Sequence, residues 1–233
     1  MNSTWTLIQQ GGALMIPIIS ASIISLFVFF ERLWSLRPSR VIPSDLVLLA
    51  LQRSSEGRYS EAMTLCEGSS STIAAIIYSG LKRRGRDRAH MKEALEEIGQ
   101  IEVSYLNRYV ELLGTIATIA PLMGLLGTVI GMIDVFRAVV TEVGMQGGMV
   151  NPASLANGIW AALITTAAGL SAAIPAFLGY KYLIGYIDRL AVELEEIGLS
   201  LLESVYPTLS DRSGRHSDHV KSLSHTDPGT GEP

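Results

Sequence analysis

The stretch LANGIWAALITTAAGLSAAIPAFLGY, residues 155–180, contains no formally charged side chain over 26 positions. At about 1.5 Å rise per residue, a helix of this length crosses the roughly 30 Å hydrocarbon layer of a bilayer. The stretch nevertheless carries Asn157, Thr165, Thr166 and Ser171, which a helix that only anchors the chain would not need. It therefore predicts a transmembrane helix whose polar side chains serve a further purpose.

Two other windows have the same apolar character. Residues 13–30 (ALMIPIISASIISLFVFF) and 112–133 (LLGTIATIAPLMGLLGTVIGMI) contain no Asp, Glu, Lys or Arg. The chain as a whole is 48% hydrophobic and 17% charged, whereas soluble domains average nearer a quarter charged residues. The windows do not alternate with period two, as strands of a membrane barrel would. They predict an all-α membrane protein with three transmembrane helices, and buried helices of a soluble protein are the alternative.

The distribution of basic residues predicts the orientation of these helices. Residues 31–110 hold twelve Lys and Arg, residues 139–154 hold none, and residues 181–233 hold five. Because basic loops are retained in the cytoplasm, we expect an external N-terminus and a cytoplasmic C-terminus. The predicted segments are an external N-terminus 1–12, transmembrane helix 1 at 13–30, a cytoplasmic helical domain 31–111, transmembrane helix 2 at 112–136, an external loop 137–154, transmembrane helix 3 at 155–180, a cytoplasmic helix extension 181–207 and a disordered tail 208–233.

The predicted cytoplasmic region contains short and long helical patterns. Three short helices are expected, one starting near Pro43 and Ser44, one ending at Gly68, and one within STIAAIIYSGLKRRGRDR. A long helix is expected from about Ala89 into the second window without interruption, and another from the third window to Pro207. The second long helix carries an apolar stripe of Leu183, Ile187, Leu190, Leu194, Ile197, Leu201 and Val205. Such stripes pack helices within one subunit, between subunits, or both.

Motifs for covalent chemistry are missing from the sequence. It holds no glycine-rich phosphate loop, no cluster with metal-ligand spacing and no nucleophile with an adjacent base, so we expect no enzyme, no cofactor and no metal. Cys66 is the only cysteine, which excludes an intrachain disulfide. The net charge of −4 gives no reason to expect a nucleic-acid partner.

Hydroxyl groups inside the apolar windows are the remaining polar feature. Thr115, Thr118 and Thr128 lie in the second window, and Thr165 and Thr166 in the third. A threonine within a membrane helix commonly donates to the carbonyl four residues earlier in its own helix. The alternative is that some of these hydroxyls line a hydrated interior and order or pass protons.

The same windows resemble the three spans of the ExbB/TolQ/MotA family, the proton-channel subunits of bacterial inner-membrane motors. The likeness is carried by GGALMIPIISASIISLFVFFERLWSL, APLMGLLGTVIGMIDVF and ALITTAAGLSAAIPAFLGY, and it covers roughly residues 8–205. It is closest to the ExbB and TolQ branches. The external segments predicted above would then face the periplasm.

The resemblance implies a multi-pass subunit of the inner membrane, in contact with membrane lipids and assembled as a homopentamer. Such a ring surrounds two helices of a single-span, ExbD- or TolR-like partner that brings the proton-carrying Asp. The complex acts on a TonB- or TolA-like protein, in TonB-dependent outer-membrane transport or a Tol-type envelope function.

The resemblance also assigns residues to the proton pathway. Thr128 corresponds to the pore threonine of the second span and Thr166 to that of the third, with Thr165, Asn157 and Ala161 as further pore-lining positions. Relatives usually carry Glu five residues before the third-span threonine, where this chain has Ala161. Either this branch lacks the carboxyl, or the sequence carries an engineered Glu→Ala change. A chain without the carboxyl also suits an alternative function, a non-conducting scaffold that holds partner helices.

Overall fold

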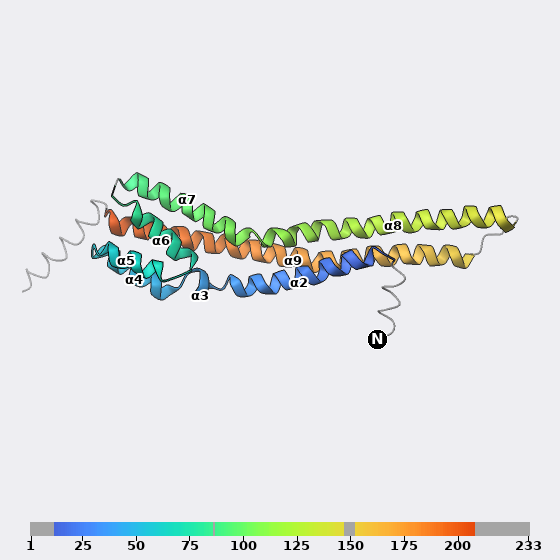
Figure 1. Ribbon diagram of the computed structural model, residues 1–233, viewed down its shortest axis with the longest axis horizontal. Coiled ribbons are helices and arrows are strands. Elements are labelled where there is room, and N and C mark those ends of the chain that lie inside the picture. Colours follow the sequence, from blue (N-terminus) through green and yellow to red (C-terminus); the bar gives the residue numbers. More distant parts are fainter. Residues whose placement is uncertain (1–11, 86, 147–151, 208–233) are drawn as a thin grey trace, which may run out of the picture. The chain divides into compact units, whose positions relative to one another are not determined.

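The computed structural model describes residues 12–85, 87–146 and 152–207, and helices are its only regular elements (Figure 1). They are α2 (Met15–Ser35), α3 (Pro38–Val41), α4 (Ser44–Ser55), α5 (Tyr59–Glu67), α6 (Thr72–Lys82), α7 (Arg88–Asn107), α8 (Val110–Gln146) and α9 (Pro152–Val205). No strand occurs in the part of the chain that the structure describes. The predicted all-α class is therefore confirmed.

Three helical segments are long and apolar enough to cross a membrane, namely Met15–Ser35, Val110–Thr141 and Leu155–Val205. They contain the second and third windows recognised in the sequence and residues 15–30 of the first. Large apolar side chains on them are exposed, including Phe27 at 72% and Leu122 at 59%. Contiguous exposed apolar surface on this scale is typical of a protein that contacts lipid or other subunits. The orientation of the segments stays a prediction.

The chain divides into two compact units, and the first comprises residues 1–37 and 104–188. It contains α2, α8 and the first part of α9, with α2 packed along α8. Ile18 of α2, Ala120 of α8, and Ala172 and Ala173 of α9 form one buried cluster. Because three of these four side chains are alanines, the backbones of the helices approach closely at this point.

The second unit comprises residues 38–103 and 189–233. Its short helices α4, α5 and α6 pack in sequence, α4 on α5 and α5 on α6. The beginning of α4 at Ser44 and the end of α5 just before Gly68 confirm the predicted boundaries. The core of this unit is apolar and includes the buried side chains of Ile73, Ile77, Leu81, Met91, Leu194, Leu201 and Leu202.

The uninterrupted helix predicted from Ala89 into the second window is wrong. α7 ends at Asn107, residues 108 and 109 form a turn, and α8 begins at Val110. No Pro or Gly marks this break in the sequence. The Tyr109 ring lies against two guanidinium groups, with Arg32 at 4.5 Å and Arg108 at 5.6 Å from its centroid. These tertiary contacts accompany a break that helix propensity alone does not predict.

The boundaries of the other predicted segments shift as well. Residues 137–146 continue α8 and residues 152–154 begin α9, so helix occupies most of the predicted loop 137–154. The continuation of the third window to Val205 as one helix is confirmed. Of the apolar stripe along α9, five side chains are buried within the chain, namely Leu183, Ile187, Leu190, Leu194 and Leu201. The predicted disordered tail 208–233 lies outside the described residues, as does the N-terminal segment except for Gly12.

Candidate functional site

In the first unit α8 and α9 run antiparallel to each other (Figure 1). Small residues line the contact between them, which is called the seam below. A Cβ atom on Gly127 would lie 2.6 Å from Cβ of Thr165, and one on Gly169 would lie 2.6 Å from the carbonyl oxygen of Ala120. Both distances are shorter than real carbon contacts, so glycine is required at these two positions. Close approach of this kind brings main-chain carbonyls of one helix within reach of side chains of the other.

The Thr166 hydroxyl makes a contact of this kind. Thr166 Oγ1 donates a hydrogen bond to the carbonyl oxygen of Gly124, at 3.0 Å. A Cβ on Gly124 would lie 3.0 Å from Cα of Thr166, so the missing side chain allows the approach. In a regular α-helix the same carbonyl also accepts the N–H of Thr128, four residues later. The Thr166 side chain is thus bonded to α8 one helical turn before Thr128, the other predicted pore threonine.

The side chain of Thr128 lies beside the seam. It is half-buried, and its Oγ1 donates to the carbonyl oxygen of Leu125 at 2.6 Å. At 3.6 residues per turn, Thr128 lies about 60° around α8 from Gly131. Gly131 faces the partner helix, because a Cβ there would lie 2.9 Å from Cβ of Ala162. Thr128 therefore occupies the edge of the α8–α9 contact.

The other three predicted site residues lie elsewhere on α9. Thr165 is 2% exposed, packs against Gly127 and donates its hydroxyl hydrogen to the carbonyl oxygen of Ala161 at 2.7 Å. Ala161 is half-buried and Asn157 is exposed. At 100° per residue they lie about 140° and about 180° around the helix from Thr166. Of the five residues, Thr166 bonds across to α8 and Thr165 packs against it, and the pore-lining roles of all five stay predictions.

Thr166 differs from the other threonines of α8 and α9 in the described part of the chain. Each of the others donates its hydroxyl hydrogen to a carbonyl three or four residues earlier in its own helix. They are Thr115, Thr118, Thr128, Thr141 and Thr165. Only the Thr166 hydroxyl reaches across to the other helix. Sequence reasoning had not selected its acceptor, Gly124, as a site residue. The only signal for it was a glycine one helical turn before Thr128.

Carboxyl groups are scarce around these hydroxyls. No Asp or Glu occurs between Glu111 and Asp134, or anywhere in residues 155–187. Asp134 lies about 9 Å along the axis of α8 from Thr128 and is paired with Arg137 at 3.3 Å. The two hydroxyls can bind a proton-bearing group, but a carboxyl beside them would have to come from outside these segments.

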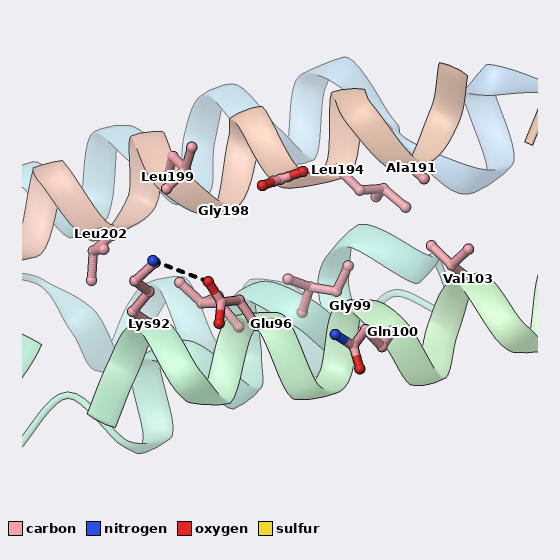
Figure 2. Close-up of a pocket in the computed structure, with 13 residues that line it drawn as sticks. Lys92, Glu96, Gly99, Gln100, Val103, Ala191, Leu194, Gly198, Leu199 and Leu202 are labelled. Carbon is pink, nitrogen blue, oxygen red and sulfur yellow. Dashed lines mark ion pairs between the residues drawn. The ribbon is translucent and has the colours of Figure 1, made fainter. Parts of the chain in front are cut away.

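The second unit holds a separate groove of about 440 Å³ between α7 and α9 (Figure 2). Gly99 and Gly198 line open parts of this groove, where an added Cβ would have no atom within 4 Å. Its walls are largely apolar, and Lys92 pairs with Glu96 at 3.2 Å at the rim. Among the described residues, no three His, Cys, Asp or Glu side chains come together to bind a metal ion. The groove suits apolar contact rather than catalysis.

Residues 69–196 match the model of the MotA/TolQ/ExbB proton channel family. The chain belongs to this family. A biopolymer transport protein ExbB homologue of Methanothermobacter thermautotrophicus is 32% identical over 192 residues, 82% of this chain and 65% of that protein. Biopolymer transport protein exbB1 of Vibrio cholerae is 32% identical over 199 residues, 84% of this chain and 85% of that protein.

A shorter match extends the likeness to the TolQ branch. The Tol-Pal system protein TolQ of Haemophilus influenzae is 42% identical over 82 residues, 35% of this chain and 34% of that protein. Membership of the MotA/TolQ/ExbB family confirms the resemblance drawn from the sequence, and it describes a channel subunit rather than a class of enzyme. The matched segment contains Thr128, Ala161 and Thr166, but the match itself assigns no role to them.

Proposed function

We propose that this chain is the proton-channel subunit of an ExbB- or TolQ-like motor of the bacterial inner membrane, driven by the proton-motive force. It would form a homopentamer around the helices of an ExbD- or TolR-like partner. The complex would energise TonB-dependent outer-membrane transport or a Tol-type envelope function through a TonB- or TolA-like protein. The external segments would face the periplasm, and the helical domain 31–111 and the helix extension 181–207 the cytoplasm.

The observation that carries this proposal is the hydrogen bond from the Thr166 hydroxyl to the carbonyl oxygen of Gly124. It joins α9 to α8 within segments of high mean hydropathy, and Thr128 follows its acceptor by four residues on α8. Polar side chains at membrane depth are retained where they face a bundle interior or a hydrated path. With family membership, this arrangement supports a path for protons along the α8–α9 edge.

The proposed partner accounts for the absence of a carboxyl group near Thr128 and Thr166. A proton path needs a group that binds and releases protons, and hydroxyls at their ordinary acidity do not. Because no carboxyl lies near Thr128 and Thr166 in these segments, the proton carrier belongs to another chain. An Asp on a single-span partner helix would meet this need.

Ala161 supports a second candidate function. Its methyl group binds no proton, so a chain that lacks the carboxyl usual in relatives could hold partner helices without conducting. In this scaffold function the small-residue seam would serve assembly alone.

Proton flux into vesicles separates the two functions. The chain is reconstituted with its partner, a potassium diffusion potential is imposed, and internal pH is followed with a dye. We expect partner-dependent flux that Ala161→Glu raises and Thr128→Val lowers several-fold. Thr118→Val is the matched control, because Thr118 makes the same kind of bond within α8 but lies about 15 Å along the helix from Thr128, and we expect its flux to change by less than about twofold. Assembled complexes that conduct neither with Ala161 nor with Ala161→Glu would establish the scaffold function instead.

A further inference from the structure

The groove between α7 and α9 in the second unit is elongated (Figure 2). On α7 its lining runs from Lys92 to Val103, and on α9 from Ala191 to Leu202. Each run spans about 16 Å at 1.5 Å per residue, which is about three helical turns. The volume of about 440 Å³ lies within the roughly 300–1,000 Å³ of sites that bind ligands. The groove therefore has the dimensions to receive a short helix.

The floor of the groove is apolar. Ile76 of α6 and Leu194 and Leu202 of α9 line it and are buried within the chain. Leu199 of the α9 wall is instead 45% exposed. An apolar side chain of an occupant would cover Leu199 and remove its surface from water.

Two glycines keep the walls of the groove apart from any side chain. A Cβ on Gly99 of α7 or on Gly198 of α9 would have no atom within 4 Å, and neither residue has a positive φ. Glycine inside a helix is less favourable than alanine. Because packing within the chain requires glycine at neither position, the space serves a contact that the chain by itself does not make.

The walls of the groove are acidic. Residues 88–103 of α7 and 189–205 of α9 together hold three basic and eight acidic side chains. Lys92 at the rim is already paired with Glu96 at 3.2 Å. Glu195, which also lines the groove, forms no ion pair with any residue that the structure describes. A negative excess of this kind attracts and orients a basic partner.

We propose that the α7–α9 groove binds a short amphipathic helix of a partner protein, with apolar side chains on the floor and Lys or Arg side chains at the acidic rim. Such a helix presents apolar residues at positions i, i+3 or i+4 and i+7, which fit a groove of three turns. A second copy that placed its own α7 or α9 there would bring acidic side chains against acidic side chains. The groove lies in the second unit, so this docking stands whether or not the chain conducts protons.

The reactivity of a cysteine in the groove reports whether the groove is occupied. Leu199→Cys places a thiol on the exposed part of the α9 wall, and the buried Cys66 adds little background. The full chain in phosphatidylcholine nanodiscs is labelled with a maleimide, with and without a synthetic peptide. The peptide has about twelve residues, with Leu at i, i+3, i+4 and i+7 and Lys elsewhere. We expect it to slow the labelling several-fold and saturably.

Matched variants separate docking in the groove from other binding. Ser200→Cys, exposed and about 100° around α9 from Leu199, should label at the same rate with and without peptide. Gly99→Leu fills open space and should abolish the protection. Glu195→Gln should raise the peptide concentration for half protection by about two- to fivefold, since one partly exposed ion pair is lost. Gln100→Cys, on the α7 wall, is the second reporter if Leu199→Cys impairs folding.

The remaining outcomes overturn the proposal. Equal protection by a peptide with Glu in place of Lys would show that charge does not select the occupant. Protection that survives Gly99→Leu, or no protection at all, would show that the peptide does not bind in the groove. A thiol at position 199 that is unreactive without peptide would show that a second copy of the chain already fills the groove.

Discussion

Gly169→Ala is the substitution that tests the α8–α9 seam most directly. A Cβ on Gly169 would lie 2.6 Å from the carbonyl oxygen of Ala120 and 3.0 Å from Cα of Gly124. Both obstacles are main-chain atoms, so no side-chain rotation relieves them. Ordinary carbon–oxygen contacts begin near 3.3 Å, and the helices must separate locally by roughly 0.5 to 1 Å.

The size of the effect follows from three contributions. Overpacking at a tight contact costs about 1–3 kcal/mol of unfolding free energy. Separation also stretches the neighbouring bond from Thr166 to Gly124, which contributes about 0.5–1.5 kcal/mol. Alanine in place of glycine returns about 1 kcal/mol through its helix propensity. We expect a net destabilisation of about 2 kcal/mol.

Gly185→Ala is the matched control on the same helix. A Cβ there would have no atom within 4 Å, so only the propensity gain applies and the protein should be stabilised by up to about 1 kcal/mol. The assay is reversible unfolding in mixed micelles, with the free energy obtained from a detergent titration of both variants and the unmodified chain. Equal stability of the two variants would show that the seam is not close-packed at Gly169, and it would undermine the geometry assigned to Thr166.

Four further outcomes follow from other parts of the chain. A cysteine placed at the exposed Gln52 should be labelled by an impermeant reagent only after permeabilisation, and one at Gln146 from outside; external labelling at Gln52 would reverse the predicted orientation. Burial raises the pKa of the Cys66 thiol to about 11, so at pH 8 it should react roughly two orders of magnitude more slowly than a free thiol, and a free-thiol rate would refute its burial. Because this pKa is raised on folding from 9.0, stability should be unaffected by the thiol below about pH 9 and should fall as the pH rises towards 11. Tyr206→Phe removes the hydroxyl that donates to the Arg84 carbonyl and should lower the unfolding free energy by about 1 kcal/mol; unchanged thermal unfolding of the purified protein would show that this bond contributes nothing.

The helical segments could be predicted from sequence because each depends on a local pattern. An uncharged window of sufficient length specifies a membrane-spanning helix whatever its neighbours are. The long run from Pro152 to Val205 was predictable for the same reason, since its apolar stripe continues past the window. The break between Asn107 and Val110 was not predictable, because it coincides with contacts of Tyr109 to an arginine of α2, far away in the sequence.

The candidate site, like the fold, could be predicted only where it depends on a local sequence pattern. Threonines in apolar windows are visible in the sequence, and the family resemblance selects two of them. Their grouping is not visible, because it depends on the register between α8 and α9, set by contacts such as that of Thr166 with Gly124, 42 residues apart. Gly124 is visible in the sequence as a small residue that permits close helix approach, but its carbonyl could be identified as the acceptor for Thr166 only from the structure.

The channel and scaffold functions both depend on the α8–α9 seam, so the seam alone does not distinguish them. Both require the close approach of α8 and α9 that Gly127 and Gly169 permit. Conduction also requires a proton-binding group beside the seam, and the segments that hold Thr128 and Thr166 offer no carboxyl of their own at this level. A carboxyl at position 161 would lie about 140° around α9 from Thr166, so it would not share the position of that hydroxyl on the helix. The absence of a carboxyl at Ala161 therefore leaves the bond from Thr166 to Gly124 unaffected, and under the proposed function conduction would depend on a group that a partner helix presents.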